Sequence, residues 1–279
     1  TVSGSAATVT LNATAISGVS STGLTFGAGG SITYPDVSSS TTGRLTINAK
    51  AYTLVSSVSD LDRLDGADAS LTSLTNPTKT TSTNVAIAKD LNASGMTYGQ
   101  SLLTTNATYG YTGNFEGLGH TISNLKIETT GYYASLIGYM SNGSTISNLG
   151  LTDIDIKGNN RLAGLVAYMS PGTTISGCYV TGTITSNNST LTMGGIAGTS
   201  AGRIQNSWSS ALISGRVSGV SAYTGGIVGA MLNSATVTNS FFNGVVNISG
   251  SSPSGGVTGG FLGSGQTISN SFSTGVVLS

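Results

Sequence analysis

The side chains most capable of chemistry in this sequence are a few carboxylates and one histidine, because only 7% of the 279 residues are charged. Asp153 and Asp155 alternate in "LTDIDIKG", so they share one face of an expected strand and could form a catalytic pair or bind a cation. Glu116 and His120, in "NFEGLGHTI", could supply a carboxylate and a base. Such groups would suit an enzyme that cleaves polysaccharides.

A structural role is nevertheless favoured for these groups. Asp153 and Asp155 are followed by Lys157, which indicates a solvated strand face. A single histidine beside glycines is typical of a hydrogen-bonded corner of the chain. We therefore predict that the protein is not an enzyme and that it has no catalytic, metal-binding or cofactor-binding residues.

A further group of aspartates lies at residues 59–71, in "SDLDRLDGADASL". Ser59 can act as an N-cap, and Leu61 and Leu64 are spaced to face a core, so the pattern predicts a short helix. The aspartate spacing fits neither an EF-hand loop nor a glycine-aspartate nonapeptide repeat. Four residues are therefore expected to form a solvated helix face: Asp60, Asp62, Asp65 and Asp68.

The overall composition argues against two classes of partner. Ten acidic and ten scattered basic residues give a net charge of zero, which lacks the basic surface of a nucleic-acid binder. Membrane insertion is not expected either, because no apolar run approaches the roughly 20 residues that cross a bilayer. The single cysteine, Cys178, excludes an internal disulfide and is expected to be a small buried residue.

The charges are unevenly distributed along the chain. All ten acidic residues lie at or before Asp155, which gives that part a net charge of −4. The four charged residues after it are basic and give +4: Lys157, Arg161, Arg203 and Arg216. The last repeat also stops in mid-pattern at Ser279, so the chain is expected to be either a fragment or a subunit that stacks head to tail.

The elements that must position these residues repeat along the sequence. Short segments such as "TISNL", "TVTNS" and "TISNS" recur, and their apolar residues are 24, 29, 29, 33 and 31 positions apart: Ile122, Ile146, Ile175, Ile204, Val237 and Ile268. The flanking runs alternate apolar and polar residues as strands do. This period predicts a β-solenoid, in which successive coils pair in parallel at about 4.8 Å.

Stacked coils place equivalent residues in columns. One column is expected to form an asparagine ladder at a turn: Asn124, Asn148, Asn206, Asn239 and Asn270. Another is expected to form an aromatic stack in the core: Tyr179, Trp208, Phe241 and Phe272. The predicted fold is therefore an all-β parallel solenoid, with an irregular β-rich part at residues 1–110 and a continuous rod of repeats at residues 111–279.

The segment "YTGNFEGLGHTISNLKI" (residues 111–127), followed by repeats of the form "GGIVG…TVTNSFFNG", resembles the GLUG-repeat proteins among bacterial surface exoproteins of the filamentous-haemagglutinin type. The resemblance implies a right-handed parallel β-helix on the bacterial exterior, with an adhesive or structural role. The sequence departs from two-partner exoproteins because it lacks the asparagine-proline motifs of their secretion domain, with "TNPT" at Thr75 as the nearest match.

Taken together, these features predict an extracellular bacterial adhesive rod that presents a Ser/Thr/Asn-rich surface. Its expected partners are a host or matrix surface, protein or glycan, or copies of itself. Two alternatives stay open: a self-assembling head-to-tail filament subunit, and a carbohydrate-active β-helix enzyme.

Overall fold

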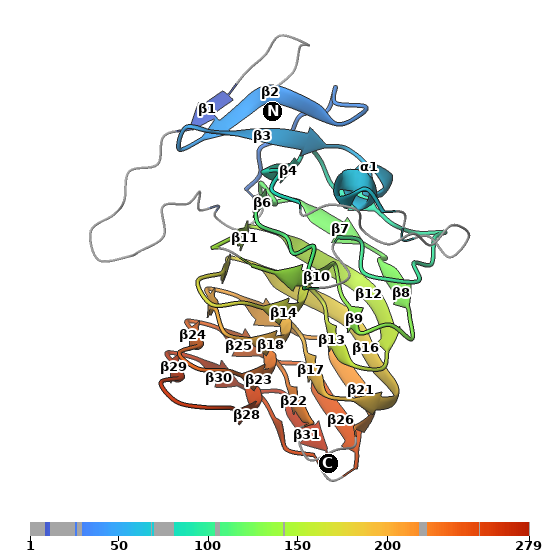
Figure 1. Ribbon diagram of the computed structural model, residues 1–279, viewed down its shortest axis with the longest axis vertical. Helices are drawn as coiled ribbons and strands as arrows, with labels where there is room; N and C mark the ends of the chain where they lie inside the picture. The colour runs from blue at the N-terminus through green and yellow to red at the C-terminus, as the bar shows by residue number, and fades with distance from the viewer. Residues whose placement is uncertain are drawn as a thin grey trace.

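The chain forms a parallel β-solenoid, which we describe from a computed structural model (Figure 1). The structure describes residues 9–11, 26, 30–67, 69, 81–103, 107–141, 143–217, 222–250 and 252–278. Each regular coil passes through four sheets in the order A, B, D and C, and the coils stack along the long axis of the molecule. The prediction of an all-β solenoid with one short helix is confirmed.

Two large sheets form two sides of the rod. Sheet A contains, in order along the rod, β1 (Val9–Leu11), β2 (Thr41–Ile47), β3 (Lys50–Val55), β4 (Val85–Ile87), β6 (Asn114–Glu116), β11 (Thr145–Ser147), β15 (Thr174–Ser176), β19 (Arg203–Gln205), β24 (Thr236–Thr238) and β29 (Thr267–Ser269). Sheet B contains β5 (Leu91–Asn92), β7 (Thr121–Ser123), β8 (Lys126–Glu128), β12 (Gly150–Gly158), β16 (Tyr179–Thr190), β20 (Trp208–Ser209), β21 (Leu212–Val217), β25 (Phe241–Phe242), β26 (Val245–Ser249), β30 (Phe272–Ser273) and β31 (Val276–Leu278).

Two smaller sheets complete each coil. Sheet D contains β9 (Tyr133–Ala134), β13 (Arg161–Ala163), β17 (Thr192–Gly194), β22 (Tyr223–Gly225) and β27 (Ser254–Gly255). Sheet C contains β10 (Ile137–Met140), β14 (Val166–Met169), β18 (Ala197–Ser200), β23 (Val228–Met231) and β28 (Thr258–Phe261).

The inner face of sheet A carries one large aliphatic residue per coil. Strand pairing places four of the predicted anchors in register, each at most 1% exposed: Ile146, Ile175, Ile204 and Val237. The first predicted anchor is wrong, because Ile122 lies in sheet B opposite Leu151, and Phe115 occupies the sheet A column. The two copies of "TISNL" therefore form different faces of the rod, which explains their short spacing of 24 residues.

The bend between sheets D and C explains the paired glycines of the repeats. The second glycine of two pairs, Gly195 and Gly226, faces the interior of the rod. A Cβ on Gly195 would collide with Ser209, and one on Gly226 would collide with the ring of Phe242. Neither glycine has a left-handed backbone, so glycine is required here for space across the core and not for conformation.

The N-terminal part of the molecule lies at the end of sheet A (Figure 1). It has a small hydrophobic core of its own. β2 and β3 form an antiparallel hairpin, and β3 then pairs in parallel with β4. Within the described residues this core contains Leu45, Leu54 and Leu118, each fully buried. Arg44, which is 7% exposed, forms an ion pair with Asp36 at 3.1 Å beside this core.

The short helix α1 (Val58–Asp62) continues into the 3-10 helix η1 (Arg63–Asp65). Its N-cap is Ser57, whose Oγ accepts a hydrogen bond from the backbone nitrogen of Asp60 at 3.0 Å. The predicted cap, Ser59, lies inside the first turn instead.

Two aspartates of this helix are buried, so their predicted place on a solvated face is wrong. Asp62 is 4% exposed and accepts a hydrogen bond from the nitrogen of Ala69 at 3.1 Å. Asp65 is 1% exposed and accepts one from the nitrogen of Ala67 at 2.9 Å. Both carboxylates therefore fix the loop that follows the helix; Asp68 lies outside the described residues.

Candidate binding groove

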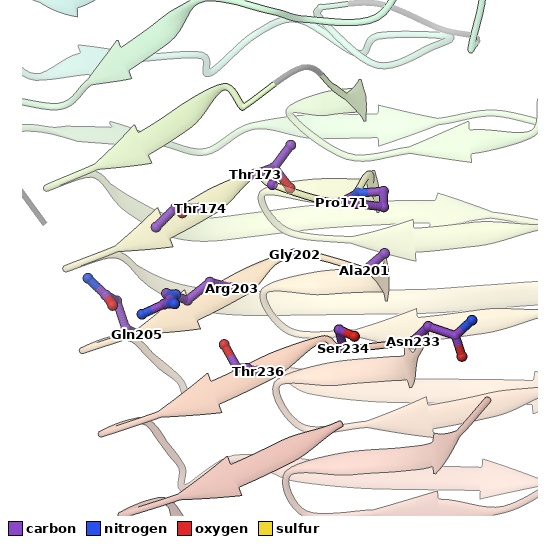
Figure 2. A pocket seen from close by; sticks show the side chains of 11 residues that line it. Pro171, Thr173, Thr174, Ala201, Gly202, Arg203, Gln205, Asn233, Ser234 and Thr236 are labelled. Carbon is purple, nitrogen blue, oxygen red and sulfur yellow. The ribbon is translucent and has the colours of Figure 1, made fainter. Parts of the chain in front are cut away.

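A polar groove interrupts the corner at which the chain passes from sheet C to sheet A. This corner is four residues long after β14 and after β23, at residues 170–173 and 232–235. After β18 it contains only Ala201 and Gly202. The two longer corners project on either side of the short one, and a groove of about 520 Å³ lies between them (Figure 2).

Local contacts hold the short corner close to the core. Ser200 is 1% exposed, and its Oγ accepts a hydrogen bond from the nitrogen of Gly202 at 3.2 Å. Gly202 lies against Thr173 of the preceding corner, where a Cβ would collide with the threonine hydroxyl. That hydroxyl donates to the carbonyl of Ser170 at 2.7 Å, so the groove has a rigid floor and wall.

Arg203 lies in this groove, directly after the short corner (Figure 2). Strand pairing aligns it with Thr174 in the preceding coil and Thr236 in the following one. Thr145 and Thr267 occupy the same column further along sheet A. Arg203 thus replaces a repeated threonine with an exposed cation, and it is the one charged side chain among the described residues that line the groove.

Two neutral side chains add hydrogen-bonding groups beside Arg203. Gln205 is 7% exposed, and its Nε2 donates to the hydroxyl of Ser176 at 3.3 Å. The hydroxyl of Thr236 is buried and has no hydrogen-bond partner among the described residues. A buried hydroxyl without a partner costs roughly 1–3 kcal/mol.

Glu116 and His120, considered above for catalysis, are buried in the contact with the N-terminal part. Glu116 Oε1 accepts hydrogen bonds from Asn148 Nδ2 at 2.8 Å and from the nitrogen of Leu118 at 3.0 Å. Burial raises the pKa of Glu116 to about 7. His120 Nδ1 lies 3.2 Å from Asp90 Oδ1, and its Nε2 lies 3.0 Å from the carbonyl of Ile32. Both side chains have structural partners.

Asp153 and Asp155 lie on the outer side of β12, on either side of the buried Ile154. Asp155 Oδ2 lies 3.6 Å from the ammonium groups of both Lys126 and Lys157. The expected solvated face near Lys157 is therefore present, and Asp155 connects neighbouring coils electrostatically.

The aromatic column stacks along sheet B, but its predicted position in the core is wrong. The ring centroids are 4.8 Å apart for Tyr179 and Trp208, 5.7 Å for Trp208 and Phe241, and 5.6 Å for Phe241 and Phe272. These residues are partly or fully exposed, whereas the next position along each strand points inward and Phe242 is fully buried. A shift of one residue reverses the face of a strand, so the column is an outer stack.

The predicted asparagine ladder is present in part. Asn148, Asn206, Asn239 and Asn270 follow paired strands of sheet A, and their φ angles of 48–53° are left-handed. Asn239 Nδ2 donates to Asn206 Oδ1 at 3.2 Å, which is one rung of the ladder. Asn124 does not belong to it, because Asn124 follows β7 in sheet B and donates to Asn92 Oδ1 at 3.0 Å.

Other sequence expectations concern metals, thiols and membranes. Within the described ranges, no three His, Cys, Asp or Glu side chains come together as a metal site, and no helix is long and apolar enough to cross a membrane. Cys178 is 1% exposed, and burial raises the pKa of its thiol to about 12.

Comparison with known proteins supports the fold and goes no further. No protein-family model matches the chain, and no curated protein matches it. Among solved structures it is similar to that of a "putative immunoglobulin A1 protease" from Bacteroides ovatus, with a TM-score of 0.59 and 18% identity over 81% of this chain and 76% of that chain. At this identity the likeness shows a shared β-helical fold, and the GLUG-type resemblance stays a prediction.

Proposed function

We propose that the protein is a non-enzymatic, structural and adhesive β-solenoid of the bacterial exterior. The observation that carries this proposal is the array of threonine and serine side chains on the outer side of sheet A, of which the Thr236 hydroxyl is itself buried. Eight side chains from four coils lie in two columns: Thr145, Ser147, Thr174, Ser176, Thr236, Thr238, Thr267 and Ser269. The groove at Arg203 interrupts both columns.

Such an array suits adhesion for a physical reason. Hydroxyl groups both donate and accept hydrogen bonds, and here they repeat at the spacing of paired strands, about 4.8 Å. Because the strands are held on both sides, little conformational entropy is lost when the surface is covered by a partner. Many weak contacts in fixed positions can then add up to stable attachment.

The partners found for the titratable groups support binding over catalysis. Glu116, His120 and Asp155 are all engaged by neighbouring groups of the fold. The location outside the bacterial cell rests on the family resemblance of the repeats.

The proposal is tested by biolayer interferometry of the intact chain on immobilised matrix proteins and host and bacterial polysaccharides. We expect saturable binding to at least one of these surfaces and loss of that binding after thermal unfolding. Binding no stronger than that of the unfolded chain would contradict an adhesive role. The same preparation is incubated with immunoglobulin A1 and with polysaccharides, and cleavage of either would contradict a non-enzymatic role.

Self-association is the other form of this proposal. The net charges of −4 and +4 on the two parts of the sequence favour head-to-tail contact in a rod. Sedimentation velocity at low and high salt measures this, and oligomers that dissociate at high salt are the expected sign of such contact.

A further inference from the structure

We infer that the groove at the short corner binds a carboxylate-bearing sugar unit of an acidic polysaccharide, with Arg203 as its anchor. This inference rests on the proposed adhesive function and names the ligand of one place on the adhesive surface. It is carried by three changes that coincide in one coil: a shorter corner, an arginine in place of threonine, and a glutamine in place of serine or threonine.

The first change is the loss of two residues from the corner. The corners of the two flanking coils are four residues long, and that of β18 is two. The total coil length hides this loss, because the path from Tyr179 to Thr192 is two residues longer than the equivalent path from Gly150 to Arg161. The strands of sheet A therefore stay in register although the corner is two residues shorter, and the shorter corner leaves room for the groove.

The second and third changes fill the same coil with larger polar side chains. The outer columns of sheet A read Thr and Ser in β15, Thr and Thr in β24, but Arg203 and Gln205 in β19. The neighbouring coils carry threonine at the position of Arg203, so the exposed arginine departs from the repeat. The arginine cation, the threonine hydroxyl groups and the groove thus occur together at one point of an otherwise repetitive surface.

The chemistry of the groove fits a carboxylated sugar. A guanidinium presents paired N–H donors that match a carboxylate in two-point hydrogen bonding. Thr174 and Thr236 stand one strand spacing on either side of Arg203, so the polar row extends about 10 Å along the rod. A volume of about 520 Å³ is in the range of small-ligand sites.

An acidic peptide fits the groove less well. Peptides bind sheets by adding a strand to an open edge, but β19 is paired on both sides, with β15 and β24. The lining also offers no large apolar or aromatic side chain that could anchor a peptide residue. A second groove of about 510 Å³ beside α1 is lined by Arg63 together with the carboxylate of Asp62, whereas Arg203 is the one charged residue among the described residues that line its groove.

The test is isothermal titration calorimetry of the intact chain with tri-galacturonate at low salt, with its methyl ester as the neutral match and tri-glutamate as the peptide match. We expect saturable binding of tri-galacturonate and at least tenfold weaker binding of the other two. Arg203→Thr, which restores the residue of the neighbouring coils, should weaken tri-galacturonate binding roughly 10- to 100-fold. Arg216→Thr removes another exposed cation, in sheet B, and should leave binding unchanged.

A second variant closes the groove without removing the charge. Replacing Ala201 and Gly202 by the sequence Ser-Pro-Gly-Thr of the preceding corner should abolish binding although Arg203 is retained. Circular dichroism and thermal melting verify that each variant is folded.

The outcomes separate this inference from the broader proposal. Binding to tested surfaces that is unaffected by Arg203→Thr, or tri-glutamate binding equal to that of tri-galacturonate, would overturn the sugar site and leave the adhesive role standing. Absence of binding to every surface and every oligosaccharide would overturn both.

Discussion

The regular coils and the N-terminal part of this solenoid use different means to hold the chain in place. In the coils, inward positions are apolar or small, and the polar side chains buried after His120 are all uncharged among the described residues, so each coil is stabilised by near-copies of itself. Where the N-terminal part meets the first coils, Glu116 and His120 are buried and hydrogen-bonded, and Asp62 and Asp65 are buried in the short helices α1 and η1. Similar coils align with one another through their repeated apolar residues. A junction between unlike segments has no such repeat, and here it is fixed by individual hydrogen bonds of buried polar side chains.

The largest effect is expected from a core substitution inside the regular coils. Phe242 is fully buried and packs against the glycine bend at Gly226. Phe242→Ala should lower the free energy of unfolding by about 3–5 kcal/mol, because it removes apolar contact and leaves a cavity. Urea denaturation followed by circular dichroism measures this loss, and a value below about 1 kcal/mol would show that this position does not face the core.

The next largest effect is expected on the pH dependence of stability, which depends on the buried Glu116 at the junction between the N-terminal part and the coils. The pKa of Glu116 is about 7 in the folded protein against an ordinary value of 4.5, so the folded state holds the proton more tightly than the unfolded chain. The free energy of unfolding should therefore fall as pH rises from about 4.5 to about 7 and then level off. The free energy of unfolding at pH 4.5 should therefore exceed that above pH 7 by about 3 kcal/mol.

Glu116→Gln should remove this pH dependence and stabilise the protein above pH 7, since the amide oxygen can still accept the bonds from Asn148 and Leu118. Thermal melts at pH 4.5 and pH 8 measure the change. Glu128→Gln, on an exposed side chain, is the matched control. Identical pH profiles for Glu116→Gln and the parent protein would refute the role given to burial.

A smaller effect is expected from the outer aromatic stack. Trp208 is partly exposed and lies between two parallel rings, at 4.8 Å and 5.7 Å. Trp208→Ala should cost about 1–2 kcal/mol, the contribution of ring pairs on a wet surface. A loss as large as that for Phe242→Ala in the same urea series would contradict an outward orientation.

The smallest effect concerns the turn column of asparagines. Asn239 has a φ of 48° and donates to Asn206, and Gly177 already occupies this column in another coil. Asn239→Gly should change the free energy of unfolding by less than about 0.5 kcal/mol, because glycine adopts the left-handed region freely. Asn239→Ala should cost about 1 kcal/mol. Equal values for the two variants would show that backbone conformation does not matter at this turn.

The coil architecture could be predicted from the sequence because stacking makes equivalent residues contact one another. It was harder to predict whether a given residue of a strand faces the core or the solvent. Phe241 and Phe242 are adjacent and chemically alike, and strand alternation alone does not say which one points inward. The repeated "TISNL" misled for a similar reason, because the first copy lies in sheet B and the second in sheet A.

The candidate groove was missed although its signal is in the sequence. Comparing "MSPGTTIS" (residues 169–176) with the equivalent "SAGRIQ" (residues 200–205) shows a corner shortened by two residues, but equal anchor spacings of 29 residues conceal it. The burial of Glu116 could not be predicted, because it depends on a hairpin that the repeat pattern does not describe. Local periodicity thus predicts contacts between similar coils and says little about contacts between different segments.

The direction of the hydrogen bonds between coils has a mechanical consequence. Those bonds run along the rod from one sheet strand to the next, so tension applied to the two ends of the described chain would load the coil interfaces in series. Under such a load coils would peel away one at a time, and each coil of 29–33 residues would release roughly 100 Å of extended chain. A solenoid pulled between two surfaces would therefore lengthen in steps and absorb work before its remaining coils gave way.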